Sequence, residues 1–70
     1  MDKAGFGKAI KIARVVNGLT QAELAEKLKV TQAAVSHWEQ GLGMPSVKQI
    51  PMIAEALKVS VAELFGEKAG

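Results

Sequence analysis

The chain has 70 residues, 49% of them hydrophobic, and a net charge of +2, and this length predicts one domain over residues 1–70 with a core from about residue 6 to residue 65. With no Cys and a single His, disulfides and thiolate metal sites are excluded, and we expect neither a metal site nor a cofactor. No apolar run approaches the roughly 20 residues of a membrane span, so a membrane is not an expected partner.

Apolar residues recur at helical spacing along nearly the whole chain, and no segment alternates as a strand would, which predicts an all-α fold. Five helices are expected, near residues 3–17, 21–28, 32–40, 47–57 and 61–65. Their starts are indicated by N-cap residues, of which Thr20, Ser46 and Ser60 each precede a Glu or Gln three positions later, as in a capping box, while Thr31 is a plain cap. The very short gap between the second and third helices predicts the tight corner of a helix-turn-helix.

The first predicted helix carries Lys3, Lys8, Lys11 and Arg14. A basic segment can meet phosphates, but it is equally typical of a solvated helix face. Pro51 lies inside the predicted fourth helix, where we expect a lost hydrogen bond and a local bend. The apolar residues expected to pack together are Phe6, Ala9, Ile10, Ala13, Ala22, Leu24, Ala25, Leu28, Val30, Val35, Trp38, Val47, Ile50, Ile53, Ala54, Leu57, Val61, Leu64 and Phe65.

The segment from Leu19 to Gly41 combines a capped helix, a short turn, a second capped helix and a Trp-Glu pair shortly before its final Gly. This segment resembles the phage Cro/CI-repressor (Xre-type) helix-turn-helix family, and Pro45-Ser46 and residues 56–65 fit the same family. The resemblance implies a compact five-helix, lambda-repressor-like DNA-binding domain with the helix-turn-helix at the second and third helices. It also implies a bacterial or phage-encoded protein that acts in the cytoplasm.

By this resemblance the third helix, residues 32–40, is the recognition helix and enters the major groove. Val35 and Trp38 point inward on such a helix, which leaves four residues on its outer face as candidate base contacts: Gln32, Ala33, Ser36 and His37. Gln can pair with adenine, an Ala methyl can touch a thymine methyl, and Ser or His can donate to base acceptors. Each residue also has an ordinary alternative role as a helix former or a solvated surface side chain.

Phosphate contacts are expected around that helix. Gln21 and Gln40 match phosphate-contact positions of the family, and the helix start beside Gln21 attracts anions. Lys29 is also expected to contact a phosphate; it stands at the turn where the family usually has Gly, and a left-handed Lys costs about 1 kcal/mol there. The loop at residues 41–45 lacks the basic residues common in the family, and Lys48 is expected to substitute in part.

Arg14 and Glu39 match a pair that forms a partly buried salt bridge in the family, so we interpret both as structural. Arg suits a planar, bidentate carboxylate partner.

An additional apolar stripe departs from the family pattern. Ile12, Val15 and Val16 recur at helical spacing on the first helix, on a face that is usually polar. Exposed apolar clusters often mark a partner surface, although fuller burial by the N-terminus is the alternative. The possible protein interface comprises Ile12, Val15, Val16, Leu42, Met44 and Met52.

The sequence therefore predicts a transcriptional regulator, a repressor that binds a pseudo-palindromic double-stranded operator as a homodimer. The alternative is a protein-interaction module, antitoxin-like or otherwise partner-binding, that keeps the fold with weak or no specific DNA binding. An enzyme is not expected, because the lone His37 has no nucleophile beside it and no Gly-rich phosphate loop is present. Both a complete small regulator and a domain of a longer protein fit the sequence.

Overall fold

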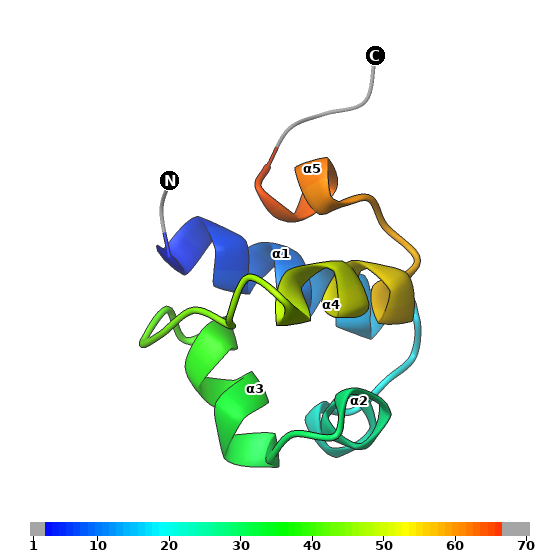
Figure 1. Ribbon diagram of the computed structural model, residues 1–70. Coiled ribbons are helices and arrows are strands. Elements are labelled where there is room, and N and C mark those ends of the chain that lie inside the picture. Colours follow the sequence, from blue (N-terminus) through cyan, green and yellow to red (C-terminus); the bar gives the residue numbers. More distant parts are fainter. Residues whose placement is uncertain (1–2, 67–70) are drawn as a thin grey trace.

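The computed structural model describes residues 3–66 (Figure 1). Residues 1–2 and 67–70, which the sequence analysis includes in the domain, lie outside this range. Five helices are present: α1 (Lys3–Val16), α2 (Gln21–Leu28), α3 (Gln32–Glu39), α4 (Gln49–Leu57) and α5 (Val61–Leu64). No strand occurs between residues 3 and 66, so the predicted all-α fold is confirmed. None of these helices has the length and apolarity that a membrane crossing requires.

Side-chain caps set the corner between α2 and α3. Thr20 accepts a hydrogen bond from the Glu23 N–H, and the Glu23 carboxylate accepts one from the Thr20 N–H, which completes the capping box. Lys29 ends α2 in the left-handed conformation, with φ 58° and ψ 43°. Thr31 then caps α3 by accepting from the Ala34 N–H. The chain therefore turns from one helix into the next within three residues, as a helix-turn-helix requires.

The core lies between α1, α3 and α4, with α2 and α5 closing it at opposite ends (Figure 1). Its most deeply buried members come from all five helices and comprise Phe6, Ile10, Leu24, Val35, Ile53, Leu57 and Leu64. The ring of Phe6 also packs 5.3 Å from that of Phe65, centroid to centroid. Ala22 and Val61, by contrast, are exposed, because each lies in the first turn of its helix on the outer side.

Helices α1 and α3 approach each other most closely at Gly7, which is buried against the last turn of α3. A methyl group on Gly7 would overlap the carbonyl oxygen of Trp38 and lie 3.0 Å from the Glu39 carbonyl oxygen. The absent side chain is therefore what lets the two backbones meet.

The fourth helix begins two residues later than the sequence predicts, at Gln49. The Ser46 N–H donates to the Gln49 side chain, but the Ser46 carbonyl accepts from both Gln49 and Ile50, and residues 47 and 48 form a turn. The predicted core position of Val47 is therefore wrong, since its side chain is 84% exposed. Pro51 is the third residue of α4, and because it has no N–H it cannot continue the series of bonds that Gln49 and Ile50 begin at the Ser46 carbonyl, as the sequence predicts.

Candidate nucleic-acid interface

The exposed face of α3 is formed by Gln32, Ala33 and His37. Val35 and Trp38, on the opposite side of the helix, are 0% and 5% exposed and hold α3 against the core. The packing therefore fixes which side of α3 faces solvent. This side presents hydrogen-bonding groups and one methyl group without any formal negative charge.

Ser36 and Gln40 differ from these three residues because they bind each other. The Gln40 amide nitrogen donates to the Ser36 hydroxyl oxygen over 2.6 Å, one helical turn apart. Ser36 is half-buried and Gln40 is exposed, directly after the last residue of α3. A base or phosphate contact by either side chain would have to compete with this bond or extend from it.

The predicted pair of Arg14 and Glu39 is a bidentate ion pair between α1 and α3. Arg14 Nε lies 2.6 Å from Glu39 Oε2, and Arg14 Nη2 lies 3.0 Å from Glu39 Oε1. Arg14 Nη1 also donates to the Leu19 carbonyl over 2.8 Å, which ties α1 to the segment before α2. The side chains of Arg14 and Glu39 are 12% and 3% exposed, so solvent screens this pair weakly.

Gln21 extends this network to the start of α2. Its amide nitrogen donates to Glu39 Oε1 over 3.1 Å, which orients the predicted phosphate-binding side chain relative to α3. Burial raises the pKa of Glu39, but the hydrogen bonds from Arg14 and Gln21 and the charges of Arg14 and Lys11 outweigh burial, so the pKa lies below its ordinary value. The hydrogen bond to Glu39 in turn raises the pKa of Arg14. Glu39 is therefore an ionised anchor that joins three helices.

The predicted phosphate-binding lysines are both exposed. Lys29 is exposed in the turn between α2 and α3, and Lys48 is exposed immediately before α4. Leu42, in the loop after α3, is 65% exposed and carries no charge. The turn before α3 and the segment before α4 thus each present one exposed lysine, whereas Leu42 adds no charge to the loop between α3 and α4.

The residues predicted for a protein interface do not form one surface. Ile12, Val15 and Val16 are 55%, 59% and 80% exposed along α1. Met52 is exposed on α4, whereas Met44 is half-buried and packs against the core. The α1 residues thus stay uncovered by the rest of residues 3–66.

Two residues that position this site were not among those predicted from the sequence. Gly7 sets the contact between α1 and α3, but a Gly within a predicted helix indicates only a loss of helix propensity. Asn17 donates its amide to the carbonyls of Ala13 and Leu57, each over 2.8 Å, and so connects the ends of α1 and α4. An Asn directly after a helix is a known stop signal and could have suggested the first of these bonds.

Comparison with known proteins gives a consistent result. A family model described as helix-turn-helix matches residues 8–64. The transcriptional activator BcrR of Enterococcus faecalis is 36% identical over 60 residues, which cover 86% of this chain and 29% of BcrR. The antitoxin HipB of Escherichia coli is 36% identical over 56 residues, covering 80% of this chain and 60% of HipB. This chain thus spans less than two thirds of either relative.

Two solved structures share the fold closely. The restriction-modification controller protein C.AhdI of Aeromonas hydrophila superposes with a TM-score of 0.84 at 30% identity, over 90% of this chain and 96% of that chain. Hydroxypropylphosphonic acid epoxidase from S. wedmorenis gives a TM-score of 0.83 at 31% identity, but this chain covers only 34% of it. The fold therefore occurs both as nearly a whole protein and as a minor part of an enzyme. Because the family model spans most of the chain and the regulator relatives agree with it, the chain belongs to the Cro/CI-repressor-like (Xre-type) helix-turn-helix family of DNA-binding transcriptional regulators.

Proposed function

We propose that the chain binds a pseudo-palindromic operator as a homodimer, with α3 in the major groove, and represses transcription. The observation that carries this proposal is the outer face of α3, where Gln32, Ala33 and His37 are exposed side by side while Val35 and Trp38 anchor the helix from behind. A rigid helix with a neutral, hydrogen-bonding face suits direct readout of base edges. A domain of this size reads one half-site, so a second copy adds both affinity and specificity.

The phosphate backbone would be held at the borders of this face. Gln21 is oriented by Glu39 at the start of α2, where backbone N–H groups favour an anion, and Lys29 and Lys48 supply positive charge. Gln40 and Ser36 act as one hydrogen-bonded unit at the far end of α3. Because only a few basic side chains are expected to contact phosphates, the affinity for DNA of any sequence should be modest. Base contacts must then supply much of the preference for the operator over other sequences.

The proposal is tested by selecting bound sites from a random duplex pool and titrating the best site and a scrambled one at two salt concentrations. We expect a palindromic site whose half-site spacing reports the dimer geometry, with clear weakening at high salt. Gln32→Ala should cost about 1–3 kcal/mol on the selected site and relax specificity at one position. Lys48→Gln should weaken both duplexes equally and lower the salt slope by about one, whereas Lys8→Gln, the same charge change outside the proposed interface, should leave the slope unchanged.

The second candidate is an interaction module that keeps the fold without specific DNA binding. It is favoured by the uncovered apolar residues of α1 and by the similarity to an antitoxin. Under this alternative the random pool shows no enrichment, and both duplexes bind weakly and to the same extent.

A further inference from the structure

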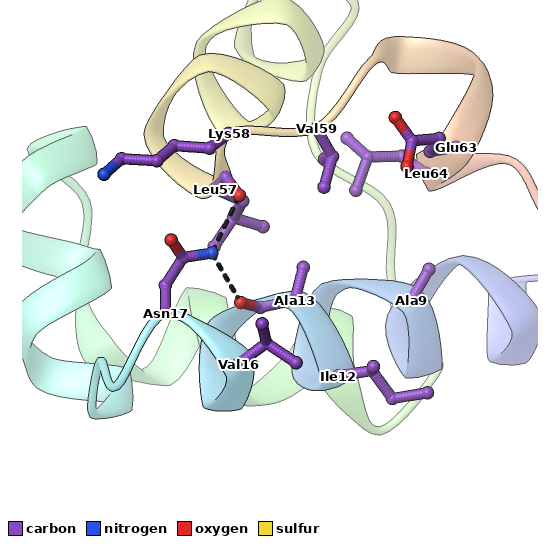
Figure 2. Close-up of a pocket in the computed structure, with 10 residues that line it drawn as sticks. All are labelled: Ala9, Ile12, Ala13, Val16, Asn17, Leu57, Lys58, Val59, Glu63 and Leu64. Atoms are coloured by element: carbon purple, nitrogen blue, oxygen red, sulfur yellow. Dashed lines mark hydrogen bonds between the residues drawn. The ribbon is translucent and has the colours of Figure 1, made fainter. Parts of the chain in front are cut away.

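An apolar groove of about 450 Å³ lies between α1, the end of α4 and α5 (Figure 2). Ala9 and Ala13 form its floor, and Figure 2 shows their methyl groups directed towards Val59 and Leu64 on the opposite wall. The two alanines, one helical turn apart, were expected in the core but are only half-buried. Their small side chains leave room between α1 and α5 that longer ones would fill.

The apolar surface continues from this groove around α1. Ile12 and Val16 line the groove and also border a shallower hollow on the other side, together with Val15. All three side chains are more than half exposed. A continuous apolar surface of this kind on a small domain is typical of a contact with another polypeptide.

Lysines outnumber acidic residues along this surface. Lys8 and Lys11 line the hollow beside Ile12, Val15 and Val16, and Lys58 borders the far end of the groove. No ion pair within 4 Å is formed by these three lysines among the described residues, where Arg14 and Glu39 make the salt bridge. The acidic residue at the groove, Glu63, is held by the Ser60 N–H in the cap of α5. Long lysine stems can cover apolar surface while their charged ends remain available at its edge.

We propose that this groove binds an amphipathic helix of another protein that has an apolar stripe flanked by acidic residues. The surface from Lys8 to Val16 is about 12 Å long, because a helix rises about 1.5 Å per residue. It can therefore contact about two turns of a partner helix, whose apolar anchor residues would stand at positions i, i+3 or i+4, and i+7. Charge complementarity selects this partner over a second copy. Two copies related by a twofold axis would bring both sets of these lysines to one interface, where Glu63 is the acidic lining residue that each copy contributes.

This groove is separate from the face proposed for DNA. None of its lining residues belongs to the set expected to contact bases or phosphates, and in Figure 1 α5 lies at the end of the molecule opposite the corner of α2 and α3. The inference does not depend on operator binding, and its test contains no DNA in its main measurement. A failure of one proposal therefore leaves the other intact.

The test uses three synthetic helical peptides of about four turns with the same leucine stripe and with Glu, Gln or Lys as flanking residues. Each is titrated into the isotopically labelled protein, and amide shifts and affinity are measured at low and high salt. We expect the Glu peptide to bind about tenfold tighter than the Lys peptide at low salt, with the difference shrinking as salt rises. The largest shifts should fall on Ala9, Ile12, Val16 and Leu64.

Two variants sharpen the test. Lys8→Glu combined with Lys11→Glu should reverse the preference, so that the Lys peptide binds tighter. Val16→Gln should lower the affinity for the Glu peptide severalfold. Val47→Gln is the control, because Val47 is about as exposed as Val16 but lies outside the groove, and it should leave the affinity unchanged. Neither residue belongs to the core.

Four results would overturn the inference: equal affinity for the three peptides, no binding at all, shifts located elsewhere, or self-association of the free protein that Val16→Gln abolishes. The last would assign the groove to a second copy. Operator affinity that falls in the lysine double variant, with peptide preference unchanged, would assign the lysines to phosphate instead.

Discussion

Replacing Gly7 by Ala tests how closely α1 and α3 must approach. The added methyl would overlap the Trp38 carbonyl oxygen and lie 3.0 Å from the Trp38 carbonyl carbon. Because a carbon–oxygen contact needs about 3.3 Å and the methyl overlaps that oxygen, the helices must separate by roughly 1 Å or more. A shift of that size would stretch the bonds of 2.6 and 3.0 Å between Arg14 and Glu39 to the limit of hydrogen bonding or beyond it.

The cost follows from these opposing effects. Overpacking costs about 1–3 kcal/mol, and a weakened contact to buried Glu39 adds about 1 kcal/mol or more, while the better helix propensity of Ala returns about 1 kcal/mol. We therefore expect a net loss of about 1–3 kcal/mol, which is a large part of the stability of a domain this small. The midpoint of thermal unfolding should fall by roughly 5–20 °C.

Urea and thermal unfolding followed by circular dichroism measure this loss. Gly43→Ala is the matched control, because a methyl there meets nothing within 4 Å, and it should change the free energy of unfolding by less than about 0.5 kcal/mol. If Gly7→Ala were as stable as Gly43→Ala, the close approach of the two helices would not be required by this residue, and the reasoning would be wrong.

Three further predictions concern the ion pair and the turn. Arg14→Ala leaves the Glu39 carboxylate buried without its partner, so unfolding experiments should show a loss of about 3 kcal/mol or more. The lowered pKa of Glu39 contributes stability that is fully present above the unfolded pKa of about 4.3 and is lost as the pH falls through the folded pKa. The free energy of unfolding should therefore fall less steeply with decreasing pH in Glu39→Gln than in the unchanged protein, and an equal slope would contradict this. Part of the slope should remain in Glu39→Gln, because the pKa of Glu23 is also lowered. Lys29→Gly removes the strain of a left-handed lysine at φ 58° and should stabilise the fold by up to about 1 kcal/mol. The same change should weaken DNA binding at low salt, because it removes a positive charge. Stronger binding would exclude a phosphate contact for Lys29.

The fold could be predicted from the sequence wherever local chemistry determines it. Thr20, Thr31 and Ser60 cap the helices that they precede, and each of those helices begins at the expected residue. Ser46 has the same sequence pattern, and its N–H donates to the Gln49 side chain, yet residues 47 and 48 form a turn and α4 begins only at Gln49. The same sequence pattern thus occurs at the start of a capped helix and at a turn that precedes a helix. This is also why the predicted core position of Val47 was wrong.

The candidate site was predictable to the level of a helix face. Spacing alone places Gln32 and His37 opposite Val35 and Trp38, and the structure has them there. The bonds that orient the site join residues far apart in the chain, such as Gln21 with Glu39, and no local pattern indicates their geometry. The groove was missed for the same reason, since Ala9 and Ala13 have the spacing of core residues and only the position of α5 leaves them half-buried.

The amide of Asn17 satisfies the Ala13 carbonyl in the last turn of α1 and the Leu57 carbonyl, 40 positions further along the chain than Asn17, at the end of α4. Helix ends normally fray independently, because their final carbonyls can exchange a weak partner for water. Here a single side chain binds both ends, so fraying at the end of α1 carries the Asn17 amide away from the Leu57 carbonyl and leaves that carbonyl without this donor. The C-terminal ends of α1 and α4 should therefore open together, and the amide hydrogens in their last turns should exchange with solvent at linked rates.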